Sequence, residues 1–338
     1  MEQIALPQTQ WSTAVEEADW VAASLAPFEA RLVASVIPPG FEAYARVLHP
    51  VRAMFGRGSR TVRWAEVAAW SGVPLRPDSQ FHSIALPPAE RREPPWQSQG
   101  PERGSLDIAD AEALIDLLGP RTGTPDDCLF CLWDGWGWDT AMVPALPGDP
   151  QLPVPDLVPA EVRYGPRVQL PGRDYLLYTG PIDAALAFAG SQGQTPNLWW
   201  PADRAWFVAS EIDLCWTYVG GPQPLIEQIL ADPRLEALPA APGQPHSLVE
   251  DFVASMAERA VADLVHTGKA VIMTSRGTLR ASLRGAGRRG RNGSLRIQTE
   301  RRQGAGSRSD RRLTTSAQDL PAELTGYLVH AIIDLAEA

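Results

Sequence analysis

The chain has 338 residues, of which 44% are hydrophobic, and a formal net charge of −10. This length is enough for two domains with hydrophobic cores. Its apolar runs are shorter than the roughly 18 residues that a membrane helix needs, and the N-terminus lacks the basic start and apolar stretch of a signal peptide. Cys128, Cys131 and Cys215 are too few for a disulfide framework, as in a reducing compartment. We therefore expect a cytoplasmic protein with no membrane partner.

The first third of the chain mixes helix and strand patterns without a regular βαβ order. Hydrophobic residues at helical spacing predict helices over 11–34, 64–70 and 107–118. In the third of these, Ile108, Ala111, Leu114, Ile115 and Leu118 are expected to face inward. Strand patterns fall at 33–37, 43–48 and 60–63.

The middle of the chain adds strands at 128–133, 174–179 and 205–212, and a helix at 222–231. The proline-dense span 144–171 is expected to be a surface loop, because repeated proline removes the donors of a strand ladder. Helices separate from antiparallel strands predict the α+β class. We expect an antiparallel sheet with flanking helices.

Charge is divided unevenly along the chain. Twelve arginines stand between Arg276 and Arg312 against only Glu300 and Asp310, a local charge of +10, so the other residues carry −20. The proline-rich span 238–247 resists continuous helix and separates two apolar segments. We therefore expect an acidic, tryptophan-rich α+β domain over 1–240 and a small arginine-rich module over 241–338.

This module is predicted to be helix, small sheet, then helix. A capping box at 247–250 begins the first helix, and the last spans 321–336. Alternation between them indicates strands with one apolar and one arginine-coated face. The apolar face is expected to hold Val271, Met273, Leu279, Ala281, Leu283, Leu295 and Ile297. The glycine- and arginine-rich stretches 285–293 and 301–312 are expected to be loops.

Two motifs place large aromatic residues beside acids: CLFCLWDGWGWD at 128–139 and NLWWPADRAWFVASEID at 197–213. Close carboxylates could bind a divalent metal or divide the acid and base roles of a hydrolase. The alternative is an aromatic and ion-pair network that holds the fold together. The candidate catalytic residues are Asp134, Asp203, Glu211 and Asp213. The candidate binding residues are Trp133, Trp136, Trp199, Trp200, Arg204 and Trp206, and Arg288, Arg289 and Arg291 in the basic module.

The remaining chemical patterns favour structural roles. Cys128 and Cys131 lie in a predicted strand, so their thiols point to opposite faces and no metal or disulfide is expected. The histidines are dispersed, and His49 is expected to be a structural, hydrogen-bonded residue. Gly285, Gly287 and Gly290 match GxGxxG, but no helix follows to supply its dipole. No cofactor is expected.

Several long motifs resemble those of a family of uncharacterised actinobacterial proteins. They are FEAYARVLHPV, TGTPDDCLFCLWDGWGW, GRDYLLYTGPI, NLWWPADRAWFVASEIDLCWTYVGG and DPRLEALP, in this order over residues 30–240. The resemblance implies neither an activity nor a ligand, and it does not extend to the arginine-rich module.

Three functional hypotheses follow. The first is a non-catalytic binding protein, regulatory, adaptor or immunity-like, with a protein partner. The second is a hydrolase that uses the clustered carboxylates, with or without a metal. The third is nucleic-acid binding through the span from Arg276 to Arg312, which lacks the aromatic residues on which single-stranded bases stack.

Overall fold

The structure is a computed structural model that describes residues 8–55, 58–85, 100–136, 159–192, 194–246, 260–261, 263–273, 277–284, 293–301, 307–313 and 328. These residues fall into two compact units. The first holds the described residues up to Ile84 and from Gly100 to His246, and the second holds Ala85 and those from Ala260 onward. None of the helices in the described ranges is long and apolar enough to cross a membrane.

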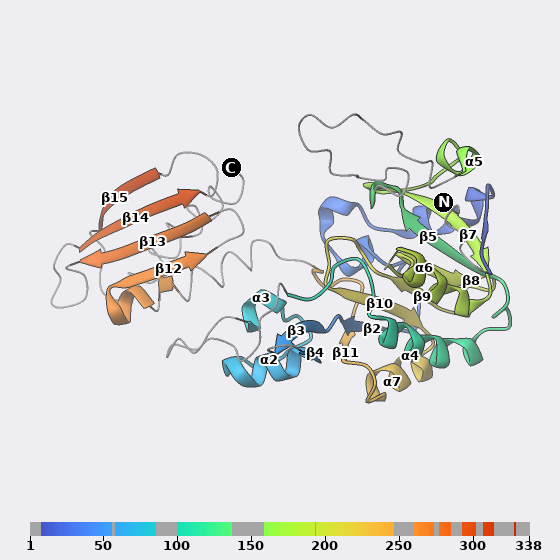
Figure 1. The fold of residues 1–338 in the computed structure, drawn as a ribbon, viewed down its shortest axis with the longest axis horizontal. Helices are drawn as coiled ribbons and strands as arrows, with labels where there is room; N and C mark the ends of the chain where they lie inside the picture. The colour runs from blue at the N-terminus through green and yellow to red at the C-terminus, as the bar shows by residue number, and fades with distance from the viewer. Residues whose placement is uncertain are drawn as a thin grey trace. The chain divides into compact units, whose positions relative to one another are not determined.

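A nine-stranded sheet forms the centre of the first unit (Figure 1). Its strands follow the order β1-β7-β5-β8-β9-β10-β2-β11, and β6 pairs with β7 beside β1. Their bounds are β1 Gln10–Trp11, β2 Ala43–Leu48, β5 Cys128–Trp133, β6 Val168–Leu170, β7 Arg173–Gly180, β8 Leu198–Pro201, β9 Phe207–Ala209, β10 Trp216–Gly221 and β11 Ala237–Ala240. All of these pairs are antiparallel, so the predicted α+β class with an antiparallel sheet is confirmed.

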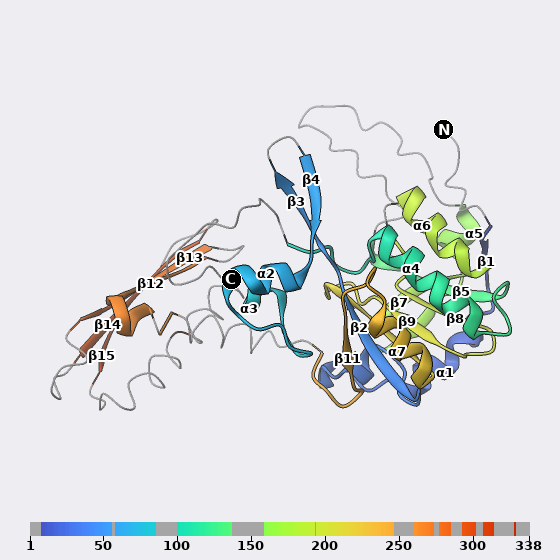
Figure 2. The ribbon, with the colours of Figure 1, turned by 90° about the horizontal axis from the view of Figure 1, so that it is seen from below.

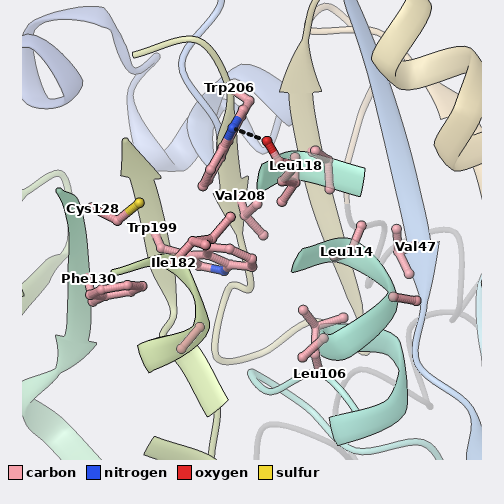
Figure 3. Packing of buried hydrophobic residues seen from close by; sticks show 14 of the residues in the cluster. Val47, Leu106, Leu114, Leu118, Cys128, Phe130, Ile182, Trp199, Trp206 and Val208 are labelled. Atoms are coloured by element: carbon pink, nitrogen blue, oxygen red, sulfur yellow. Dashed lines mark hydrogen bonds between the residues drawn. The ribbon is translucent and has the colours of Figure 1, made fainter. Parts of the chain in front are cut away.

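Three helices, α4 (Ile108–Leu118), α6 (Ala185–Gln192) and α7 (Gln223–Ala231), pack against one face of this sheet. Figure 3 shows Leu114 of α4 beside Val47, with Trp199 and Val208 to their left in the same cluster. Trp206 is also part of this core, and its indole N–H donates to the Leu118 carbonyl at 3.1 Å. The helices thus bury one apolar face of the sheet.

The opposite face is buried as well. Trp20 of α1 (Asp19–Ser24) meets Trp200 edge to face, with ring centroids 6.1 Å apart. At the other end of the sheet, Trp64 of α2 (Trp64–Ser71) meets Trp216 at 6.3 Å. Strands β5, β8, β9 and β10 therefore lie between two apolar layers.

The first unit also contains a hairpin and several short helices. A separate two-stranded hairpin, β3 (Val51–Phe55) and β4 (Gly58–Val62), extends away from the sheet in Figure 2. The remaining helices are η1 Val15–Ala18, η2 Phe28–Ala30, η3 Val33–Ser35, α3 Phe81–Ile84, η4 Gly119–Arg121, η5 Asp134–Trp136, α5 Ala160–Arg163 and η6 Ile182–Ala184.

The second unit is a four-stranded antiparallel sheet in the order β12-β13-β14-β15. Its strands are β12 Lys269–Met273, β13 Gly277–Arg284, β14 Gly293–Arg301 and β15 Ser307–Leu313. Side chains alternate as predicted in the two central strands: Leu279, Ala281, Leu295 and Ile297 are buried, whereas Arg280, Arg296 and Gln298 are exposed. Ala260, Val261, Leu264 and Leu328 are buried in the same unit. The sheet is therefore amphipathic.

Two predictions near the N-terminus are wrong. The helix expected over 11–34 is broken into β1, η1, α1, η2 and η3. It stops after Ser24 because Leu25 is extended and Pro27 precedes a new turn. The strand expected at 33–37 is instead a 3₁₀ turn, in which the Ser35 hydroxyl binds the Pro27 carbonyl at 2.8 Å.

Other predictions need smaller corrections. The strand at 205–212 covers only Phe207–Ala209, and the predicted loops at 144–171 and 301–312 contain α5, β6 and β15. Ile108 and Val271, expected to face inward, are 46% and 43% exposed. The capping box at 247–250, Arg288, Arg289, Arg291 and the helix at 321–336, apart from Leu328, lie outside the described residues.

The first prediction tests the core around Trp206. Trp206→Ala leaves a large cavity and an unbonded Leu118 carbonyl, so it should lower the free energy of unfolding by about 3–5 kcal/mol. Trp206→Phe keeps most of the ring and should cost about 1–2 kcal/mol. Tyr164→Ala, at a side chain that is 81% exposed, is the control and should change it by less than about 0.5 kcal/mol. Urea unfolding measures all three, and equal losses for Trp206→Ala and Tyr164→Ala would contradict this packing.

Candidate functional site

The two aromatic motifs lie side by side in the first unit. Strand β5 pairs with β8, so that Phe130 is opposite Trp199 and Leu129 is opposite Trp200. Because side chains alternate along a strand, Trp199 and Trp200 point to opposite faces of the sheet. Trp199, Trp200 and Trp206 are each at most 1% exposed. In this structure the three rings pack inside the unit and do not form an exposed surface.

Two other predicted binding residues lie nearer to solvent. Arg204 is exposed, has a left-handed backbone with φ of 57°, and places its guanidinium 5.0 Å from the centroid of the Trp20 ring. Trp133, at the end of β5, is partly exposed. The side chain of Trp136 lies outside the described set.

Glu211 lies in the turn between β9 and β10 and is the buried member of a compact ionic group. We call this group the Arg173 cluster; it consists of Phe28, Trp133, Arg173, Glu211 and Asp213. Arg173 binds Glu211 through Nε at 3.1 Å and Asp213 through Nη2 at 2.8 Å. Its guanidinium lies 4.8 Å from the Phe28 centroid and 5.9 Å from that of Trp133. One cation is thus held by two carboxylates and two aromatic rings.

The two acids of the Arg173 cluster differ in their surroundings. Glu211 is 6% exposed and also accepts the backbone N–H of Asp213 at 2.6 Å. Burial raises the pKa of Glu211, although that hydrogen bond and Arg173 both favour its charged form. The side chain of Asp213 is 68% exposed. The cluster therefore fixes the turn between β9 and β10 against β7.

The other two predicted acids have separate partners. Asp134 forms an ion pair with Arg167, Oδ2 to Nε, at 3.1 Å. Asp203 accepts the Thr122 hydroxyl at 2.8 Å and the Gly123 N–H at 2.7 Å. Those bonds to Gly123, Thr122 and the Ala205 amide lower the pKa of Asp203 despite its partial burial.

The four acids consequently do not gather in one site, although Glu211 and Asp213 share a partner. Asp203 binds the turn that precedes β5, whereas Asp134 follows the end of the same strand. Glu211 and Asp213 share a cation, which leaves both oriented by Arg173. In the described ranges, no group of three or more His, Cys, Asp or Glu side chains is placed to hold a metal ion.

A second polar group, buried under β10, is centred on His49. Its Nδ1 lies 2.9 Å from the Glu102 carbonyl, which can only accept, so Nδ1 carries the proton. Nε2 therefore accepts the Thr217 hydroxyl at 2.8 Å, and Ser210 must donate to Thr217 at 2.6 Å. Burial lowers the pKa of His49 to about 4, so the ring is neutral at pH 7. As expected from the sequence, this histidine is structural.

The cysteines are structural in the same sense. All three are free and buried, and burial raises the thiol pKa of Cys128 to about 12 and that of Cys215 to about 11. Cys128 points into the helix-covered core, while Cys131 is on the opposite face of β5. The sequence predicted that residues 128–133 form a strand with the two thiols on opposite faces, and the pairing of β5 confirms the strand.

Sequence reasoning missed Arg46, an almost fully buried cation in β2. Its guanidinium lies 3.8 Å from the centroid of Trp216, and it donates to the carbonyls of Pro77 and Ser79 at 2.8 Å each. Burial lowers its pKa, and no carboxylate among the described residues forms an ion pair with it. Arg46 thus ties the 76–80 turn to the sheet. The sequence did hold one signal for its burial, because Arg46 stands inside the otherwise apolar strand sequence AYARVL.

Asp110 was also missed, although it stands in the first turn of α4. It is 9% exposed, and burial, together with the nearby charge of Asp107, raises its pKa to about 7. Arg63 opposes this shift. A carboxyl that is half protonated at neutral pH makes the stability of this helix depend on pH.

The second unit offers a different kind of surface. On the solvent face of its sheet, the register places Lys269, Ser282, Arg296 and Asp310 in one row, and Val271, Arg280, Gln298 and Arg308 in the next. Lys269, Arg280 and Arg296 are all exposed. We call this the basic face.

No family model, no curated protein and no solved structure matches the chain.

The second prediction separates the two acids of the Arg173 cluster. Glu211→Ala leaves a partly buried cation, Arg173, and a backbone N–H with fewer partners, so it should cost about 2–3 kcal/mol of unfolding free energy. Asp213→Ala removes an exposed partner and should cost less than about 1 kcal/mol. Chemical denaturation at pH 7 measures both variants, and an Asp213→Ala loss as large as that of Glu211→Ala would overturn the assignment.

The third prediction concerns Asp110. Its folded pKa of about 7 lies above the ordinary value of 3.8, so the folded state binds the extra proton. Its contribution to stability is therefore fully present below pH 4 and is lost as pH rises through 7. Asp110→Asn should raise the unfolding free energy above pH 8, by at most about 4 kcal/mol, and flatten the dependence between pH 4 and 7. Thermal melting across this range checks the sign; a steeper rather than flatter profile in Asp110→Asn refutes it.

Proposed function

We propose that the protein is a non-catalytic binding protein that holds an acidic partner protein through the basic face of its second unit. The observation that carries this proposal is the amphipathic sheet: Leu279 and Leu295 are buried on one side, while Arg280 and Arg296 are exposed on the other. Exposed charge that a fold orients on one face is the usual means of recognising a complementary macromolecule.

The first unit supports a binding role over the hydrolase alternative. Each of the four candidate acids already binds an arginine, a hydroxyl or a backbone amide of this unit. Asp203 stands at the opposite end of β5 from Asp134, and the one adjacent pair, Glu211 and Asp213, is already bound by Arg173. That pair is therefore held as an ion-pair group and not as the separate acid and base that such catalysis requires. The aromatic motifs stabilise the sheet that supports these ion pairs.

Charge and composition favour an acidic protein over nucleic acid. Residues outside the span from Arg276 to Arg312 carry −20, which repels a long polyanion that extends past the basic face. No tryptophan, tyrosine or phenylalanine stands between Arg276 and Arg312, so bases find no ring to stack on in that span. A compact acidic patch on a protein needs no aromatic ring for stacking and does not extend past the basic face.

The fourth prediction uses two probes for the full chain: a poly-L-glutamate peptide short enough to stay on the basic face, and a longer duplex DNA. Poly-L-glutamate should bind more tightly than duplex DNA, and its affinity should fall from about 50 to about 200 mM salt because the contacts are exposed ion pairs. Arg280→Gln with Arg296→Gln removes two such contacts and should weaken binding up to about tenfold.

The control is Arg103→Gln with Arg76→Gln, which makes the same charge change at exposed positions of the first unit. These variants should bind like the parent protein. Tighter binding of duplex DNA than of poly-L-glutamate would transfer the role of the basic face to nucleic acid. Equal losses in both pairs of variants, or no binding to either probe, would exclude the basic face as the binding surface.

A further inference from the structure

Strand β12 forms one edge of the sheet in the second unit, with β15 at the other edge (Figure 1). The two edges differ in chemistry. Strand β15 has the sequence SRSDRRL, with four charged residues in seven. Such charge is a common protection against pairing with another strand. Strand β12, KAVIM, has a single charge at its first residue.

The hydrogen-bond pattern shows which backbone groups of β12 face outward. The Leu283 N–H donates to the Gly268 carbonyl at 2.9 Å, so residue 268 faces β13. In an antiparallel ladder the direction alternates, and Ala270 and Ile272 therefore also bond toward β13. The N–H and C=O groups of Lys269, Val271 and Met273 point away from β13, to the side of β12 on which no described strand pairs.

Lys269 and Val271 differ in what meets these outward groups. The Thr267 hydroxyl accepts the Lys269 N–H at 3.3 Å, and its one proton faces two carbonyls, that of Asp263 at 2.8 Å and that of Lys269 at 2.9 Å. For Val271, no hydrogen bond outside the β12–β13 ladder joins its backbone to another described residue. Its side chain is 43% exposed on the same face as Arg280. Val271 is thus an exposed apolar residue at the middle of β12 whose outward backbone groups bond to no other described residue.

We infer that β12 pairs with β12 of a second copy of this chain, antiparallel and centred on Val271. Only outward-facing residues can exchange bonds, which limits the register to pairs among residues 269, 271 and 273. Centring on Lys269 brings two like charges together and uses groups that Thr267 already binds. Centring on Val271 pairs the two exposed valines and sets each Lys269 opposite Met273.

This register makes a closed and symmetric contact. The two Val271 residues exchange N–H to O=C bonds across a two-fold axis perpendicular to the sheet, so each copy uses the same surface. Side chains on the basic face of both copies then lie on the same side of one continuous sheet. The inference stands on the edge geometry and does not depend on the proposed function. The contact of two five-residue strands is small, which gives a weak dimer.

Sedimentation equilibrium of the full chain tests the inference between about 10 μM and about 1 mM. A reversible dimer should form in this range. Val271→Lys places two like charges directly opposite each other and should raise the dimer Kd at least about tenfold. Gln298→Lys adds the same charge to the same face on the internal strand β14 and should leave the Kd within about twofold.

A second variant gives a positional readout that does not depend on the Kd. Facing residues of an antiparallel pair have Cα atoms about 5.5 Å apart, a separation that a disulfide spans. Val271→Cys should therefore cross-link two copies when oxidised glutathione accepts the two electrons, while Gln298→Cys, about 24 Å from its counterpart across five strand spacings, should not. The native thiols are buried and should not compete.

A chain that stays monomeric at the highest concentration, a Val271→Lys variant that dimerises like the parent, or equal cross-linking of Val271→Cys and Gln298→Cys would each overturn the inference.

Discussion

The first unit depends on the burial of its central strands on both faces. Helices α4, α6 and α7 cover one side of the sheet, and Trp20 and Trp64 cover the other. Every side chain of β8 is consequently packed, whichever way it points. Most polar groups in this region find partners inside the protein, because an unsatisfied buried group costs about 1–3 kcal/mol. The indole N–H of Trp199 is an exception among the described residues.

The polar groups of the sheet follow from this constraint. Asn197 immediately before β8 accepts the Trp133 N–H at 2.9 Å and donates to the carbonyls of Gly104 and Ser210, both at 3.1 Å. His49 and Arg46 likewise bond to carbonyls that β-structure leaves free. Carboxylates, which need arginines and water, are confined to the strand ends, as in the Arg173 cluster. This division explains why the aromatic motifs contain acids without assembling them in one site.

A helix or strand could be predicted from the sequence where its own residues show a clear hydrophobic periodicity. Elements with clear periodicity, such as β2, β5, α2 and α7, were predicted to within about two residues of their bounds. Strands β8 and β10 were missed because a strand buried on both faces loses the alternation that identifies it. In β12 the alternation was read with the opposite phase, since Val271 rather than Ala270 is exposed. Strand β15 was missed because its charged sequence is typical of a loop.

The candidate site was less accessible to sequence reasoning than the fold. Glu211 and Asp213 lie in the turn after β9 and not in the strand predicted at 205–212, and both bind Arg173. Arg173 lies 38 residues from Glu211 in the chain and had no local signal. Arg46 and Asp110 are unusual because the fold buries these charged residue types, and composition does not reveal which charged residues are buried. The basic face was visible as charge density, whereas its orientation required the register of β13 and β14.

Hydrogen–deuterium exchange of the full chain, with and without poly-L-glutamate, tests the central claim most directly. If the basic face binds and the aromatic motifs only stabilise the sheet, the ligand should slow exchange in β13 and β14 and leave residues 128–136 and 197–213 unchanged. Slower exchange confined to 128–136 and 197–213 would place binding at the aromatic motifs and contradict this account.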